Sequence, residues 1–374
     1  MTLIRGTGRD LRVDFFRGIA LFCIFLDHIP HDTLARFTVR NLALNDATEI
    51  FILLAGFAAA LVYGRKLDRA GPLSAGADMA RRAWTLYIAH IFLAVLFIAL
   101  VSALADQFHR PHYLAAIGLQ AFIANPLRAS IHLVLLTYQP AYLNVLPLYV
   151  AIMAGIAPLL ILLRHPRILL LSSFALYVGA RLFGWNLPTA SGHGWFFNPL
   201  TWQFLFVLGM SFARYGRPNL PPRSTDALAI ATLALGFIIL LTTWIEPRLA
   251  RHVPTLIAPL IRNIDKSGLH PYRLASILAL AWLAARHFRA DHLIMRSRAA
   301  ALFILIGQYG LSTYCASILL SFLGRAILET DPGWLAQLFV NAAGLSLLWA
   351  IAALGAWYKL KDSKPKDPHP HADA

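Results

Sequence analysis

Apolar residues along this chain gather in long blocks, which short polar and basic segments separate. Each block is close to the roughly 20 residues that a helix needs to cross the hydrocarbon core of a bilayer. The short alternating segments of membrane β-strands are absent from the sequence. We therefore predict an all-α, polytopic integral membrane protein with about ten transmembrane helices, at residues 13–31, 46–63, 83–105, 145–163, 167–184, 199–215, 227–245, 273–287, 299–323 and 334–358.

The composition is that of a membrane protein. Of 374 residues, 58% are hydrophobic and 14% are charged, whereas soluble domains carry about 25% charged residues. A net charge of +15 would suit nucleic-acid binding in a soluble protein, but here Lys and Arg fall in the loops. About twice as many of them lie on the side of the N-terminus as on the other side, which places both termini in the cytoplasm. We predict no nucleic-acid partner.

The pattern predicts one membrane-embedded domain over residues 1–358 and a polar, Pro-rich cytoplasmic tail at 359–374 that is disordered. Two long loops, 106–144 and 246–272, lie on the outer side, and loops of that length usually have a function. We expect the first to form short helices on the membrane surface. Cys23 and Cys315 lie in apolar runs and are interpreted as buried hydrophobes, so we predict no metal site.

Two ionisable residues, Arg17 and His28, stand eleven positions apart within the first predicted span. Eleven residues of helix rise about 16 Å and return to nearly the same face, so both side chains lie on one stripe. Ionisable groups within hydrocarbon cost about 2.5–3.5 kcal/mol each on insertion scales, so they indicate a functional site. Asp14 can pair with Arg17 at i,i+3, and Arg17 lies deep enough to face an anionic ligand.

Two carboxylates, Asp46 and Glu49, stand at the outer end of the second span, at the depth of His28. A carboxylate beside a histidine fixes its tautomer and raises its basicity, which suits a general base acting on a hydroxyl. Asp27 precedes His28 but points about 100° away around the helix. The catalytic candidates are therefore His28, Glu49, Asp46 and Asp27, with a structural buried pair as the alternative.

Polar and aromatic residues gather in the other outer segments. Aromatic rings stack on the apolar faces of sugars and amides bond hydroxyls, which makes a sugar site one interpretation and interfacial anchoring by Trp the other. The candidates for substrate binding are Trp202, Gln203, His193, Asn198, Arg273 and His270. On the inner side, a basic loop suits the phosphates of a cytosolic cofactor, although the positive-inside rule also explains it; its candidates are Arg65, Lys66, Arg81 and Arg82.

These segments resemble a known family. The spacing from Arg17 to His28 resembles the signature of the acyltransferase-3 superfamily of membrane acyltransferases, and the other segments resemble its OpgC family. They cover the chain from Arg9 to about Trp357 and read Arg12-x-Asp14-x-x-Arg17-Gly18, Asp27-His28-Ile29-Pro30, Asn45-Asp46-Ala47-x-Glu49-x-Phe51, Gly56-Phe57, Leu146-Pro147-Leu148-Tyr149, Asn198-Pro199-x-x-Trp202-Gln203-x-x-Phe206 and His270-Pro271-Tyr272-Arg273-Leu274. The sequence departs from the family form at Gln308, where the family has Arg.

The resemblance implies a succinyltransferase of osmoregulated periplasmic glucans in the bacterial inner membrane. The implied donor is cytosolic succinyl-CoA, a co-substrate, and the implied acceptor is a hydroxyl of a periplasmic β-glucan. Transfer of an acetyl or other acyl group to a different envelope polysaccharide is an alternative. An anion or sugar transporter is the alternative outside enzymes, although the internal repeats typical of transporters are not found in the sequence.

For this activity, we expect the inner basic loop to hold the phosphates of CoA, with Arg17 and Asp14 completing the cofactor-binding set. His28 would take the proton from the sugar hydroxyl, which attacks the thioester. Asp46 or Glu49 would orient His28 and stabilise its cation. A covalent acyl-histidine intermediate is equally compatible with the sequence.

Overall fold

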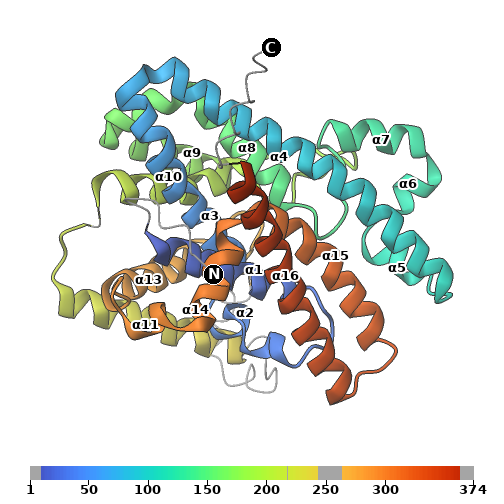
Figure 1. Ribbon diagram of the computed structural model, residues 1–374. Coiled ribbons are helices and arrows are strands. Elements are labelled where there is room, and N and C mark those ends of the chain that lie inside the picture. The colour runs from blue at the N-terminus through green and yellow to red at the C-terminus, as the bar shows by residue number, and fades with distance from the viewer. Residues whose placement is uncertain (1–9, 217, 243–262, 363–374) are drawn as a thin grey trace, which may run out of the picture.

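The computed structural model describes residues 10–216, 218–242 and 263–362. Within these residues the regular structure is helical (Figure 1), apart from an isolated antiparallel β-bridge between Pro188 and Gly194. The predicted all-α class is therefore confirmed. Among the described residues, six helical runs are long and apolar enough to cross a membrane: Ala47–Gln107, Val145–Arg164, Pro166–Phe183, Pro222–Leu240, Gly310–Leu328 and Trp334–Lys361.

Each apolar block predicted from the sequence contains a helix. In chain order, the longer helices are α1 (Leu11–Asp27), α3 (Ala47–Ala59), α4 (Arg65–Gln107), α8 (Val145–Ile156), α9 (Pro166–Phe183), α10 (Pro199–Tyr215), α11 (Pro222–Leu240), α13 (Pro271–His287), α14 (Arg298–Gln308), α15 (Gly310–Leu328) and α16 (Trp334–Asp362). Shorter helices are α2 (Val39–Leu42), α5 (His112–Ala116), α6 (Gln120–Ala124) and α7 (Pro126–Val134). The last three confirm the short helices expected within 106–144.

Three features differ from a row of separate straight spans. A π-helical turn at Ala60–Gly64 joins α3 to α4 in one helical run, which bends at Gly71, where φ is 79°. The block 299–323 is broken at Tyr309 into α14 and α15. Residues 359–362 of the predicted tail continue α16, while 363–374 and part of the loop 246–272 lie outside the described residues.

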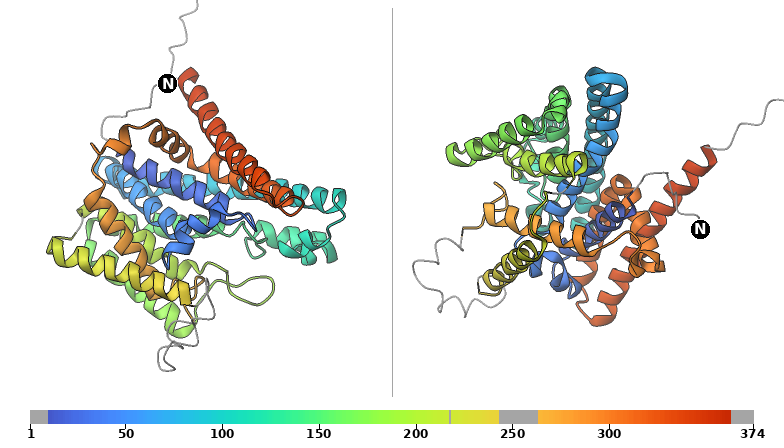
Figure 2. Two further views of the ribbon diagram at one scale, coloured as in Figure 1. Left: turned by 90° about the horizontal axis from the view of Figure 1, so that it is seen from below. Right: turned by 90° about the vertical axis from the view of Figure 1, so that its left-hand side faces the viewer.

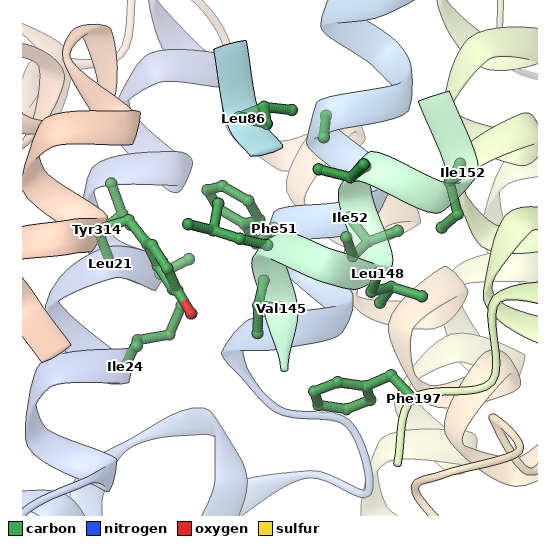
Figure 3. Close-up of a cluster of buried hydrophobic side chains, with 14 of the residues drawn as sticks. Leu21, Ile24, Phe51, Ile52, Leu86, Val145, Leu148, Ile152, Phe197 and Tyr314 are labelled. Carbon is green, nitrogen blue, oxygen red and sulfur yellow. The ribbon is translucent and has the colours of Figure 1, made fainter. Parts of the chain in front are cut away.

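Helix α1 lies in the middle of the bundle, between α16 on one side and α11 and α13 on the other (Figures 1 and 2). It packs most extensively on α14 and also contacts α3 and α15. Figure 3 shows Leu21 and Ile24 of α1 facing the same apolar core as Phe51, Leu148 and Tyr314. The helices pack one side on this core and leave large apolar side chains such as Phe92 and Leu171 exposed on the other, which explains why the sequence shows apolar blocks with little amphipathic pattern.

Two glycine pairs set the closest helix crossings. A Cβ atom on Gly18 of α1 would lie 1.9 Å from the Phe303 carbonyl oxygen, and one on Gly307 of α14 would lie 1.8 Å from that of Asp14. Gly56 of α3 and Gly209 of α10 are in equally tight contact with the partner backbone, at 2.0 and 2.1 Å. Small residues allow such close backbone approach in membrane bundles. The crossings fix α1 against α14 and α3 against α10.

We expect Gly18→Ala to lower the stability of the folded protein by about 2–3 kcal/mol, because the new methyl group forces α1 away from α14. The measurement is thermal unfolding of the purified protein in detergent. Gly155→Ala in α8 is the matched control, since a Cβ there meets nothing within 4 Å. Equal melting temperatures for the two variants would contradict this account of the α1–α14 crossing.

Candidate functional site

His28 follows the last residue of α1 and caps that helix. Its Nδ1 lies 2.6 Å from the carbonyl oxygen of Ile24, and since a carbonyl only accepts, Nδ1 carries the proton. Nε2 is then the basic nitrogen of the neutral ring. The ring also meets Tyr142 edge to face, with centroids 4.9 Å apart. A single helix therefore supplies both the histidine and the group that fixes its tautomer.

The two carboxylates that we expected beside His28 bind elsewhere. Glu49 has no exposed side-chain surface. Its Oε1 accepts from Nε of Arg273 at 2.7 Å and lies 2.5 Å from Nη2 of the same side chain in an ion pair. Asp46 pairs with Lys266 and lies 3.5 Å from Arg273 Nη2. The Ile24 carbonyl thus takes the orienting role that the sequence analysis gave to Asp46 or Glu49.

The position of these carboxylates on α3 explains their partners. Asp46 is the N-cap, and its Oδ1 accepts from the Thr48 amide at 2.8 Å. Glu49 is the third residue of the helix, and its Oε2 accepts from the Asp46 amide at 3.0 Å. This reciprocal arrangement is a capping box. The remaining oxygens meet Lys266 and Arg273, so the result is a buried cluster of two anions and two cations.

Asp27 also has a local partner. Its Oδ1 accepts from the Thr38 hydroxyl at 2.6 Å, which fixes the chain that returns from α1 toward α2. The expected divergence of Asp27 from His28 agrees with this contact. Asp27 therefore supports the end of α1, on which His28 lies.

Arg17 and Asp14 lie one helical turn apart in the interior of the bundle. Arg17 Nη1 is 3.4 Å from Asp14 Oδ1, as the i,i+3 spacing predicts, and Nη2 donates to the Leu54 carbonyl of α3 at 3.3 Å. A Cβ on Gly310 would lie 3.3 Å from Arg17 Cδ. The guanidinium group is therefore placed where α1, α3 and the first residue of α15 meet.

The basic loop lies on the first turns of α4 and on both sides of the bend at Gly71. Lys66 pairs with Asp78 across this bend, and Arg65 and Arg81 are exposed. Arg82 is half-buried and interacts electrostatically with the hydroxyl of Tyr149, as does Arg17. Positive charge thus extends from the exposed start of α4 toward Arg17.

Three substrate-binding candidates make hydrogen bonds that support the chain, and their role in binding stays a prediction. Asn198 caps α10 by accepting from the Leu200 amide at 3.0 Å. Trp202 is fully buried and donates to the Ser267 carbonyl at 3.0 Å, and Gln203 exchanges hydrogen bonds with Ser173 at 2.6 and 2.8 Å. They lie in the interior because α10 packs between α3 and α9.

The remaining candidates fall in different places. His270 caps α13, accepting from the Tyr272 amide at 3.2 Å, and burial together with Arg181 lowers its pKa. Arg273 belongs to the ion cluster described above. His193 lines a polar cavity of about 960 Å³ between residues 118–144 and 186–196. The sequence analysis identified none of the lining residues in 118–144, although their amide and hydroxyl groups stand out in an apolar chain.

A second, apolar groove of about 1060 Å³ lies between α1, α3, α10, α11 and α13. Its lining includes Phe16, Leu53 and Trp282, with Arg12, Arg286 and Arg289 among its charged residues. This groove does not contain His28 or Arg17. The chemistry-bearing side chains are thus separate from this apolar groove.

The comparisons with known proteins bear on this arrangement. A family model described as OpgC protein matches residues 9–360. The chain belongs to the OpgC family. Membership implies an acyltransferase-type role in glucan modification. The basic imidazole nitrogen of His28, at the end of a helix in the OpgC protein, suits such a role. No curated protein and no solved structure matches this OpgC-family chain.

Proposed function

We propose that the protein transfers a succinyl group from cytosolic succinyl-CoA to a hydroxyl of a periplasmic β-glucan. It does so as a bacterial inner-membrane protein with about ten spans and both termini in the cytoplasm. The observation that carries the proposal is the Nδ1–carbonyl bond of His28, which leaves Nε2 as a base. Arg17 lies on the same helix toward the basic start of α4, so anion-binding groups and the base stand at different ends of α1.

In the proposed reaction, Nε2 of His28 removes the proton of a sugar hydroxyl as the oxygen attacks the thioester carbonyl. The carbon–sulfur bond breaks, and the imidazolium returns the proton to the CoA thiolate. The Ile24 carbonyl supports the cation by accepting from Nδ1–H. In the covalent variant, Nε2 itself attacks the thioester carbonyl, the carbon–sulfur bond breaks, and CoA leaves as the thiolate. The sugar oxygen then attacks the acyl carbon, the bond from Nε2 to that carbon breaks, and the hydroxyl proton passes to the thiolate.

The basic residues at the start of α4 hold the CoA phosphates in this proposal, because Arg and Lys form charge-assisted hydrogen bonds with phosphate. Arg17 contacts the anionic part of the donor nearer the reacting carbon. The ion cluster around Glu49 positions α3 and α13 beside the end of α1.

The direct test incubates purified protein with labelled succinyl-CoA and a β-glucan. Labelled glucan that forms only with both substrates supports succinyl transfer. Labelling from acetyl-CoA at a higher rate would favour the alternative acyl donor. Anion flux across proteoliposomes without any donor, and no labelled glucan, would favour the transporter.

We expect Arg17→Gln to raise the KM for succinyl-CoA by about 10- to 100-fold, since a hydrogen bond to a charged group contributes about 1.5–3 kcal/mol. Arg17→Lys should recover part of the loss because it keeps the charge. Steady-state kinetics at saturating glucan measure the effect, and Arg36→Gln, at an exposed site, is the control. An unchanged KM in Arg17→Gln would rule out donor binding by Arg17.

A further inference from the structure

The polar cavity between residues 118–144 and 186–196 has the character of a carbohydrate site. Its volume of about 960 Å³ is at the upper end of the range for ligand pockets, roughly 300–1000 Å³. Amide groups of Gln139 and Asn144 and the hydroxyl of Thr189 line it together with the ring of Phe196. Amides and hydroxyls bond sugar hydroxyls, and aromatic rings cover the apolar faces of sugars.

The charges of the residues that line the cavity limit the class of ligand that it can bind. Among the lining residues Arg128 is the one with a fixed charge, and no carboxylate is present. An anionic ligand of this size would need several cations, and a cationic ligand would need carboxylates. A neutral, hydroxyl-rich ligand fits this lining.

One lining group has an unmet hydrogen bond. Asn144 Oδ1 is buried and has no hydrogen-bond partner among the described residues, although its residue stands at the start of α8, where Asn usually caps the helix. A buried acceptor without a donor is unfavourable unless a ligand supplies one. A sugar hydroxyl is a donor of the required kind.

The walls of the cavity are fixed before any ligand binds. The Ala190 amide donates to the Thr137 carbonyl at 2.8 Å and joins the two segments. Trp195 Nε1 donates to the Pro188 carbonyl at 3.2 Å, and Asn186 Nδ2 donates to the Trp195 carbonyl at 2.9 Å. A site organised in this way loses little conformational freedom on binding.

The segment that lines one side of the cavity also contacts His28. Tyr142, whose ring meets the imidazole edge to face, lies between the lining residues Gln139 and Asn144. Its backbone has a φ of 72°, a conformation that non-glycine residues rarely adopt and that is often found at functional sites. Lys266, which pairs with Asp46, adjoins the lining residue Ser267. The segment 139–144 therefore connects the cavity to the base.

We propose that this cavity binds the acceptor as a neutral β-linked oligoglucoside, with Asn144 and Gln139 bonding its hydroxyls and Phe196 covering a sugar face. The inference rests on the proposed function, because it assigns the acceptor to a site whose wall segment, 139–144, contacts His28 through Tyr142. The apolar groove between α1, α3, α10, α11 and α13 has no Asn or Gln among its lining residues and only the hydroxyls of Thr225 and Thr232, so it suits such a ligand less well.

The test measures the Kd of a β-linked glucose hexamer by calorimetry on the full-length protein in nanodiscs. We expect Phe196→Ala and Gln139→Ala each to weaken binding by about tenfold or more. Asn144→Leu, which keeps the approximate shape of the side chain and removes the acceptor, should do the same. Phe37→Ala, at an exposed ring outside the cavity, is the control and should bind as the parent protein does.

Melting temperatures distinguish loss of the binding site from loss of the fold. A variant is included only when its melting temperature equals that of the parent protein. Phe196→Ala is the most robust variant, because that ring is about half exposed. If the parent protein does not bind the hexamer, or if Phe196→Ala and Gln139→Ala bind it unchanged, the inference is overturned. If the cavity variants lose binding but the parent shows no succinyl transfer, the cavity assignment stands and the proposed reaction fails.

Discussion

His28→Asn protein is expected to fold normally and to transfer succinyl groups at least about a thousandfold more slowly than the parent. General-base catalysis contributes about 10²–10⁴-fold, and Asn has no basic nitrogen. The Asn amide stands where Nδ1 does in histidine, so it keeps a donor for the Ile24 carbonyl. The change therefore removes the base and preserves the hydrogen bond that caps α1. Initial rates of label transfer from succinyl-CoA to glucan measure the loss.

A nearby histidine provides the matched control. His31 is exposed and has a φ of 68°, a left-handed conformation that Asn adopts readily. His31→Asn should transfer at the parent rate and melt at the parent temperature. Transfer by His28→Asn at more than a tenth of the parent rate would show that another group is the base.

The two proposed routes predict different trapped species. A covalent route leaves label on the protein when the reaction is quenched before glucan is added, and His28→Asn abolishes that label. Direct transfer leaves none on either protein. Both routes require His28, so the rate measurement above does not depend on the choice between them.

Arg273→Met is expected to lower stability by about 3–5 kcal/mol, the range for breaking a buried ion pair by removing one partner. Glu49 is fully buried, and with Arg273 gone it would either hold an unpaired charge or take up a proton, both of which cost free energy. Removing both charges in Arg273→Met/Glu49→Met should recover much of the loss, since no unpaired charge remains beside α3. Unfolding of Arg273→Met, Glu49→Met and the double variant, each compared with the parent, gives the coupling energy between Arg273 and Glu49.

Arg289→Met is the control for this series, because the pair of Arg289 with Asp291 lies in solvent and its loss should not change the melting temperature measurably. If the double variant is as unstable as the sum of the two single variants, the ion pair does not have the proposed role. The cluster would then be a set of independent charges.

The helices were predictable because a continuous apolar block in a membrane protein has few other structures available. The break at Tyr309 was not, since the block 299–323 is apolar on both sides of it and Gly310 is the main local signal. The single helical run through α3 and α4 was also missed. Gly71 and Pro72 resemble an ordinary loop, whereas in the structure they bend an otherwise helical segment.

In the site too, contacts within one helix could be predicted from the sequence, whereas contacts between distant segments could not. Arg17 and His28 were predictable because one helix fixes their relation, and the pairing of Arg17 with Asp14 follows from the same geometry. The partner of Glu49 lies 224 residues away in the sequence, so helix packing alone determines it. The polar cavity likewise needs two segments to meet, and neither shows a recognisable motif by itself.

The tight crossing at Gly18, together with the bond from Thr38 to Asp27, leaves the imidazole of His28 on a nearly immobile support. In the proposed reaction, the acyl donor therefore has to reach a fixed base. A donor held by its phosphates near the start of α4, as proposed, would deliver its carbonyl carbon along a flexible arm, and the length of that arm would set which donors can reach His28. Selection among donors would thus depend on the length of this arm as well as on binding affinity.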